Sequence, residues 1–235
     1  MKIEQHCPIC VNKKFDRTGQ PIVSVKISHF VLNDSGIQPI TCENGHDYAV
    51  VFDSAKFETL FDVGMRALAD GYVREAVSSF AASLERFYEF YLGYMSDVQQ
   101  LPQAVFESSW KKISNQSERQ LGAFIFVYAF FTKNAPPILS NNEVSFRNKV
   151  IHKGYIPKTD EAEKFGKAIY DSIMQVLGEL EQKDPDSLLS YHHRQCPQSS
   201  GFNWTVRQSA NAINIRRKRK GSSNFGFEHV KKFFP

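Results

Sequence analysis

Apolar side chains recur at steps of three and four residues through the middle of the chain, which predicts amphipathic helices. Similar spacing predicts helices at 55–69, 72–92, 103–114, 118–133 and 160–182. In the last of these, Asp160 can cap the helix and Glu163 can complete a capping box. The clearest apolar face lies within 72–92 and predicts a stripe that packs into a core rather than around a ligand: Val73, Ala76, Val77, Phe80, Leu84, Phe87, Tyr88 and Tyr91.

A shorter helix follows from its capping residues. The stretch NAPP interrupts the helical pattern, and Ser140 with Glu143 then forms a capping box, so a helix of about three turns should begin near Asn141. Gly154 and the proline that soon follows it should end this helix. A short loop then leads into the long helix that starts near Asp160.

The first part of the chain has a different pattern. Its β-branched residues alternate partly with polar ones over 21–32 and again over 46–52, with the turn signal NDSG between, which predicts short strands. Two or three short strands bury too little surface to fold alone. We therefore expect an α+β fold that is mostly α, in three parts: a small β unit at 1–54, a helical domain at 55–183, and a basic, loosely folded or disordered extension at 184–235.

Cysteine and histidine spacing supplies what the small β unit lacks. Cys7 and Cys10 form a C-x2-C pair, and Cys42 and His46 follow as C-x3-H. Zinc prefers four thiolate or imidazole ligands in a tetrahedron, and two short turns can clasp one ion between them. The pattern predicts a zinc-ribbon-like unit with a structural zinc ion, with His6 as an alternative ligand. The competing interpretation is three ordinary buried cysteines and a surface histidine.

Composition narrows the class of protein. A hydrophobic content of 42% with 20 Phe among 235 residues is enough for a proper core. The longest apolar run, LGAFIFVYAFF at 121–131, is shorter than the roughly 20 residues that cross a membrane, so it predicts a buried core helix. The N-terminal MKIEQHCPIC carries charge and cysteine where a signal peptide has an apolar stretch. We expect a cytoplasmic protein with reduced cysteines and no membrane contact.

Charge is distributed unevenly along the chain. Residues 191–235 contain nine Lys or Arg and one acidic residue, whereas residues 1–190 contain 20 basic and 24 acidic residues. Basic side chains neutralise phosphates while aromatic rings stack on bases, so the tail is a candidate for RNA binding. A solvated, solubilising tail is an equally simple interpretation. The candidate contacts are Arg216, Arg217, Lys218, Arg219 and Lys220, with Trp204, Phe225 and Phe227 near them.

The stretch SFRNKVIHKGY at 145–155 places Arg147, Asn148 and His152 on one short helix. Together with the aromatic helix SSFAASLERFYEFYL before it and the long helix after it, RNKVIH resembles the HEPN superfamily of α-helical, nucleic-acid-directed proteins, whose motif is Arg-polar-x3-His. The resemblance covers roughly 55–183 and leaves the zinc part and the tail aside.

The resemblance implies a metal-independent endoribonuclease that works as a homodimer, often as a toxin or in antiviral defence. Arg147, Asn148 and His152 would be its catalytic set, with Lys149 and Lys153 as RNA contacts. The chemistry is coherent, because an imidazole exchanges protons near neutral pH and a guanidinium can hold phosphoryl oxygens. A homodimer would supply the second imidazole that acid and base steps require. Glu85 or Glu89 could assist, although exposed helix carboxylates are usually only solvated.

Two other functions are compatible with the sequence. Some HEPN proteins have lost catalysis and only bind nucleic acid or act as adaptors. Others are subunits that pair with a nucleotidyltransferase-like antitoxin, so a regulatory partner is a further expectation. RNA cleavage that survives a chelator, at a concentration that leaves the fold intact, would distinguish the nuclease from both alternatives.

Overall fold

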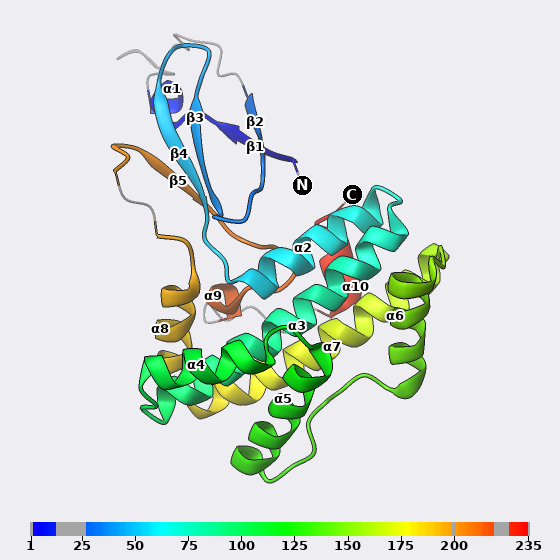
Figure 1. Cartoon of the computed structure of the whole chain (residues 1–235). Helices are drawn as coiled ribbons and strands as arrows, with labels where there is room; N and C mark the ends of the chain where they lie inside the picture. The colour runs from blue at the N-terminus through cyan, green and yellow to red at the C-terminus, as the bar shows by residue number, and fades with distance from the viewer. Residues whose placement is uncertain (1, 13–26, 199–200, 219–225, 235) are drawn as a thin grey trace. The chain divides into compact units, whose positions relative to one another are not determined.

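The computed structural model describes residues 2–12, 27–198, 201–218 and 226–234 (Figure 1). The chain divides into two compact units. Unit 1 contains residues 1–54 and 196–210, and unit 2 contains 55–195 and 211–235. The first boundary therefore falls at the expected position, between Ser54 and Ala55, but the C-terminal segment is shared between the two units and is not a unit of its own.

Unit 1 is built from short strands. Strand β1 (Lys2–His6) leads through the one-turn helix α1 (Pro8–Asn12) and pairs antiparallel with β2 (Ile27–Val31). Strands β3 (Ile37–Thr41) and β4 (Asp47–Phe52) form an antiparallel hairpin. Strand β5 (Thr205–Gln208) pairs parallel to β4 on its other side. Because β4 is the central strand of its sheet, its residues from Tyr48 to Phe52 are all buried.

The expected strands are confirmed where the structure describes them. The segment expected at 46–52 is β4, and the second half of 21–32 is β2, whereas 21–26 lies outside the described residues. Strands β1, β3 and β5 were not predicted. Pro39 lies within β3, where a missing N–H weakens the strand signal, and β3 is an edge strand that tolerates this loss.

Unit 2 is helical, so the predicted class, α+β and mostly α, is confirmed. Its central element is α3 (Val73–Val98), which packs against α2, α5, α6 and α7. All members of the predicted stripe on α3 are buried except Val73, which is partly buried, so the core assignment is confirmed. The remaining helices are α2 (Lys56–Ala69), α4 (Gln103–Ile113), α5 (Ser117–Thr132), α6 (Asn141–Lys153), α7 (Thr159–Lys183), α8 (Pro185–Gln195), α9 (Ile215–Lys218) and α10 (Phe227–Lys231).

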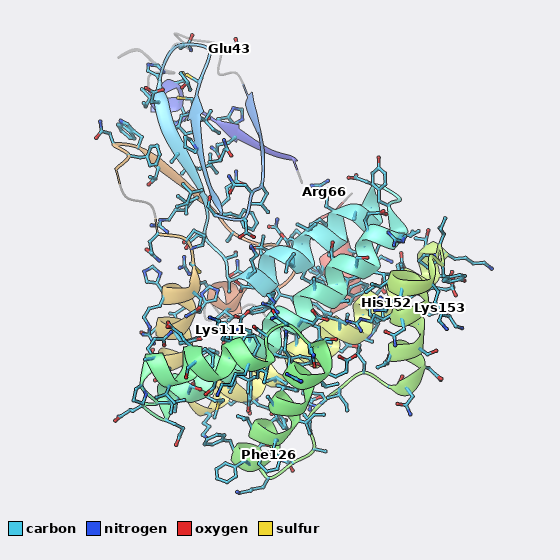
Figure 2. All side chains as sticks on the ribbon, in the orientation of Figure 1. Glu43, Arg66, Lys111, Phe126, His152 and Lys153 are labelled. Carbon is cyan, nitrogen blue, oxygen red and sulfur yellow. The ribbon has the colours of Figure 1, made fainter. Side chains whose placement is uncertain are left out.

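Two expectations about these helices were wrong in detail. Helix α7 begins at Thr159, so Lys158 and not Asp160 precedes its first turn. The Lys158 backbone N–H donates to the Glu161 side chain at 2.8 Å, and Glu163 does not take the predicted capping role. Helix α5 is apolar on most sides, but only one face is buried. Phe126 is 77% exposed, so the apolar run is not a fully buried core helix (Figure 2). Among the described residues, no helix has both the length and the apolar character needed to cross a membrane.

The C-terminal segment is more ordered than its composition predicts. Carboxylates of α2 hold it: Asp62 accepts the backbone N–H groups of Asn211 and Ala212, both at 2.8 Å, and Glu58 accepts that of Ile215 at 2.9 Å. The described part of the segment also contributes buried apolar side chains, namely Ala212, Ile213, Ile215, Phe227, Val230 and Phe234. The loosely folded extension is therefore wrong for the described residues, since apolar burial and buried backbone hydrogen bonds hold it in place.

Candidate metal centre and candidate active site

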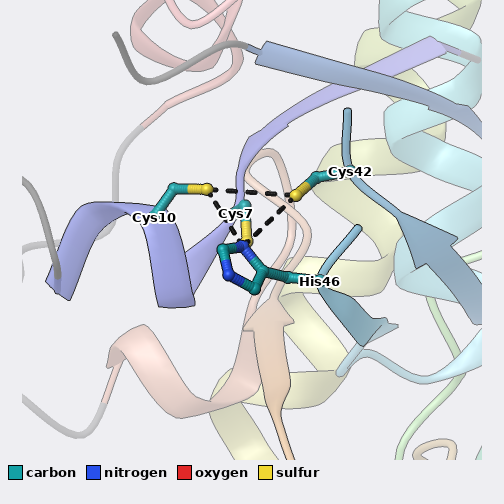
Figure 3. Close-up of side chains that lie close together, drawn as sticks. All are labelled: Cys7, Cys10, Cys42 and His46. Atoms are coloured by element: carbon teal, nitrogen blue, oxygen red, sulfur yellow. Dashed lines mark hydrogen bonds between the residues drawn. The ribbon is translucent and has the colours of Figure 1, made fainter. Parts of the chain in front are cut away.

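Cys7, Cys10, Cys42 and His46 lie together in unit 1, with their ligand atoms all within 4.8 Å of one another (Figure 3). Cys7 directly follows β1 and Cys10 lies on α1, so the first pair sits in the turn after a strand. Cys42 and His46 flank the turn between β3 and β4. The fold therefore brings together two half-sites that are far apart in sequence, and the predicted four-ligand group is confirmed.

The distances fit a tetrahedral metal site. The Cys10 and Cys42 Sγ atoms are 3.9 Å apart, and His46 Nδ1 lies 3.3 Å from Cys10 Sγ and 3.6 Å from Cys42 Sγ. Bond lengths of about 2.3 Å to sulfur and 2.1 Å to nitrogen place the ligand atoms of a zinc tetrahedron about 3.6 to 3.8 Å apart. Three of the four residues are buried and none is a carboxylate, so the donor set suits a thiophilic ion.

The turn between Cys42 and His46 is shaped by the local sequence. The Gly45 N–H donates to the Cys42 carbonyl at 2.8 Å, and Gly45 has φ of 73°, a left-handed conformation that favours glycine. Asn44 Nδ2 donates to Cys10 Sγ at 3.2 Å, the kind of contact that steadies a thiolate ligand. The alternative ligand His6 is exposed and is not among the grouped residues.

The two thiols with resolved shifts respond differently to their surroundings. Burial raises the pKa of the Cys7 thiol. Burial acts on Cys42 in the same direction, but hydrogen bonds from the His46 and Asn44 backbone and from the Cys7 and Cys10 thiols together outweigh it and lower the pKa of Cys42. Hydrogen bonds to a thiolate favour its charged form, which is the form that binds metal.

Helix α6, which carries the candidate catalytic residues, has the predicted ends. The Ser140 side chain accepts from the Glu143 N–H at 3.4 Å, and Glu143 in return accepts from the Ser140 N–H at 2.6 Å. Gly154 ends the helix with φ of 69°. The helix stays regular through Lys153, so it does not fray before Gly154, and the stepwise 100° rotation of a regular helix separates Arg147 from His152 by about 140°.

Arg147 is held by two partners. Its Nη2 lies 2.7 Å from Glu85 Oε1, across from α6 to α3, and its Nη1 donates to Asn148 Oδ1 at 3.2 Å. The other candidate carboxylate, Glu89, pairs with Arg86 instead, at 2.6 Å. With 19% of the Arg147 side chain and 28% of the Glu85 side chain exposed, this pair is more protected from solvent than an ordinary surface ion pair.

His152 is separate from this cluster within one chain. It is exposed at the end of α6 together with Lys153 (Figure 2), and its side chain makes no hydrogen bond or ion pair with another residue that the structure describes. Lys149 is also exposed. The structure therefore brings Arg147 to Asn148 but leaves His152 and the two lysines facing solvent.

A pocket of about 110 Å³ lies next to the Arg147 pair, with walls from α3, α5, α6, α7 and the segment before α6. Its apolar lining is Ala81, Leu84, Leu121, Leu139, Val144 and Phe165. Its polar lining is Glu85, Tyr88, Ser117, Glu118 and Arg147. Neither the pocket nor the place of Tyr88 and Glu118 in it follows from the sequence, because Tyr88 has the spacing of a core residue and Glu118 that of a surface one.

The basic run of the tail is described only in part. Arg216, Arg217 and Lys218 lie on the short helix α9, whereas Arg219 and Lys220 lie outside the described residues. Arg216 Nη2 lies 2.8 Å from His193 Nδ1. Of the neighbouring rings, Trp204 is 45% exposed and Phe225 is outside the described residues, but Phe227 is 2% exposed and packs in the core. Phe227 is therefore not available to stack on a base, contrary to expectation.

Comparisons of the chain with protein-family models, with curated proteins and with solved structures give no match. Function is therefore inferred from the residues of this chain and their arrangement.

Proposed function

We propose that unit 2 is a metal-independent endoribonuclease of HEPN type. The observation that supports it best is the Arg147 cluster. A guanidinium is fixed by Glu85 and Asn148 beside a pocket, while the histidine of the same motif stays accessible at the end of the same helix. A solvated surface arginine has no need of a carboxylate from another helix, whereas a guanidinium that must meet a phosphate gains from such positioning.

In this proposal Arg147 stabilises the anion formed during cleavage. Each of its two terminal nitrogens donates one N–H to a protein partner, which fixes the plane of the guanidinium and leaves its remaining N–H groups to phosphoryl oxygens. Asn148 then acts as a positioning residue for Arg147. Glu85 has the same role, because its carboxylate contacts the guanidinium rather than any reacting atom.

His152 supplies the proton transfers. Cleavage of RNA through its 2′-hydroxyl requires a base to remove that proton and an acid to protonate the departing 5′-oxygen. One accessible imidazole per chain serves both steps only if a second copy is present, so we propose a two-fold homodimer that pairs the Arg147 cluster of one chain with His152 of the other. The exposure of Lys149 and Lys153 suits contacts with RNA phosphates on either side.

We further propose that the metal in unit 1 is zinc with a structural role. The fully protein-derived set of three cysteines and one histidine closes the tetrahedron and leaves no position for a substrate. The buried cluster around it is small, with Cys7, Cys10, Cys42, Tyr48 and Val50 as its buried members, so the binding energy of the ion would be folding energy for this unit.

Cleavage of labelled RNA by the full-length protein tests the proposal, with a chelator present at a level that leaves bound metal unchanged. His152→Ala and Arg147→Ala should each lower the rate by about 10² to 10⁴, while His193→Ala, another exposed histidine, should have no effect. In a mixture of the two variants each heterodimer keeps only one His152, so no restored activity is expected if both imidazoles are required. Partial activity would show that one imidazole acting with Arg147 of the other chain is enough. Wild-type cleavage by His152→Ala, or no cleavage of any RNA by the native protein, would instead favour the binding or adaptor function.

A further inference from the structure

The pocket beside Arg147 has the size and lining of a site for one edge of a flat ring system. Its volume is about 110 Å³, smaller than the apolar cavity of about 150 Å³ that encloses benzene in an engineered protein, so a larger ring system would enter by one edge and keep the rest outside. Leucine, valine, alanine and phenylalanine side chains from five parts of unit 2 form its walls. Glu118 and Val144 are the exposed members of the lining and mark its open side.

Two of the five polar side chains that line this pocket are carboxylates, which only accept hydrogen bonds when ionised. Glu85 and Glu118 provide two carboxylates against one guanidinium, so the lining carries a net charge of −1. Glu85 uses one oxygen for Arg147, and Glu118 contacts only Ser117 Oγ, at 3.4 Å, among the described residues. A net negative lining repels a free phosphate from the pocket itself, whereas carboxylate oxygens that are not saturated favour a ligand with N–H donors.

One donor completes the pattern. Tyr88 lines the pocket and is 5% exposed, and its hydroxyl makes no hydrogen bond with any other residue in the described part of the chain. Burial, and then the nearby charge of Glu85, raise the pKa of Tyr88, so its hydroxyl remains protonated. A ligand with a carbonyl acceptor would give this hydroxyl a hydrogen-bond partner in place of water.

We infer that this pocket receives the Watson–Crick edge of one guanine base of the RNA, beside the phosphate that Arg147 would hold. The inference rests on the proposed ribonuclease function and adds its base preference. On its Watson–Crick edge guanine presents two adjacent N–H donors next to one carbonyl acceptor, which matches two carboxylates and one hydroxyl. Uracil presents one donor between two carbonyls, and cytosine and adenine present a ring nitrogen acceptor where guanine has a donor, so each would leave a polar group unpaired.

The same chemistry could come from a free guanine nucleotide, and the experiment separates the two sources. Binding of guanosine and uridine monophosphates to the full-length protein is measured by calorimetry, in parallel with cleavage of short RNAs that differ only in one base, guanine or uracil. Guanine should be preferred by about tenfold or more in both measurements, as expected when one charged hydrogen bond separates the two ligands.

Variants at the open side of the pocket locate the binding. Val144→Trp should close the pocket and lower guanosine monophosphate binding by about tenfold or more. Ser145→Trp, the neighbouring exposed position that does not line the pocket, should leave binding unchanged. Glu118→Gln exchanges an acceptor oxygen for donor N–H groups and should reduce the guanine preference while helix content stays the same. His152→Ala should bind guanosine monophosphate normally although it cleaves nothing.

The outcomes separate this inference from the proposed function. Guanine binding that Val144→Trp abolishes, in a protein that cleaves no RNA, would keep the pocket and reject the nuclease. RNA cleavage with equal rates at guanine and uracil, unaffected by Val144→Trp, would keep the nuclease and overturn the inference. Strong binding of the free nucleotide without any guanine preference in cleavage would also overturn it, because the pocket would then serve a free nucleotide and not the RNA.

Discussion

Two glycines on different helices enclose one aromatic ring in the core of unit 2, and replacing either should destabilise the fold. Phe80 on α3 is fully buried, with Gly64 of α2 on one side of its ring and Gly166 of α7 on the other. A Cβ at Gly166 would lie 2.7 Å from Phe80 Cε2, and one at Gly64 would lie 2.6 Å from Phe80 Cδ1. Because both sides are close, the ring cannot retreat from one added methyl without meeting the opposite helix.

The size of the effect follows from two opposing terms. Overpacking a tight core costs about 1 to 3 kcal/mol, whereas exchanging glycine for alanine in a helix interior gains up to about 1 kcal/mol. We therefore expect Gly166→Ala to lower the free energy of unfolding by about 1 to 2 kcal/mol. Gly122 on α5 is the matched control, because a Cβ there meets nothing within 4 Å. Gly122→Ala should leave stability unchanged or raise it by up to about 1 kcal/mol.

Urea unfolding followed by helical circular dichroism, with metal present to hold unit 1 folded, measures both variants. The Phe80→Leu background supplies the second test, since a smaller and more flexible side chain should remove at least about 1 kcal/mol of the Gly166→Ala penalty. Equal unfolding midpoints for Gly166→Ala and Gly122→Ala would refute the reasoning. So would a penalty that is the same with and without the Phe80 ring, because the contact would then not be its cause.

Three further predictions concern the metal, the tail and alkaline stability. Full-length protein should contain one zinc ion per chain, and Cys42→Ser should lose this ion and unfold at a lower temperature. Cys196 is a buried cysteine outside the cluster, so Cys196→Ser should keep the zinc. Metal analysis that finds no zinc in native protein would reject the site. Changing the basic run 216–220 to glutamine should flatten the salt dependence of RNA binding by about one unit of slope for each basic side chain that neutralises a phosphate. Deleting 214–235 would be a less specific test, because it would also remove the buried Phe227 and Val230. Equal salt slopes for the native protein and the glutamine variant would show that these basic side chains are solvated and do not contact RNA phosphates. Burial raises the pKa of Tyr170 to about 12. Burial together with a hydrogen bond to Glu179 raises the pKa of Tyr128 to about 12 as well. Since an unfolded tyrosine ionises near 10, their contribution to stability is complete below about pH 10 and is lost as pH rises towards 12, so phenolate absorbance from these residues should appear together with unfolding. Their ionisation in a protein that keeps its helix content would contradict this.

Local signals in the sequence determined the helices and each half of the metal site. The capping box of Ser140 and Glu143 forms as predicted because its partners are three residues apart and need no other part of the chain. The apolar stripe on α3 follows from helical periodicity alone. C-x2-C and C-x3-H spacings likewise fix two half-sites, each within a single turn. In every case the interacting groups are near neighbours, so the sequence order already sets their geometry.

Only the tertiary structure decided which distant groups meet. Glu85 and Glu89 look equivalent on one helix, yet Glu85 reaches Arg147, 62 residues away, while Glu89 pairs within its own helix. The tail has the composition of a polar, basic extension, but β5 joins β4 in parallel and the carboxylates of Glu58 and Asp62 bind the tail backbone. Composition averages over such a segment and cannot register a few backbone hydrogen bonds and buried rings. Interactions of this kind depend on which surfaces the packed helices and strands bring together, and no local pattern along the chain encodes that choice.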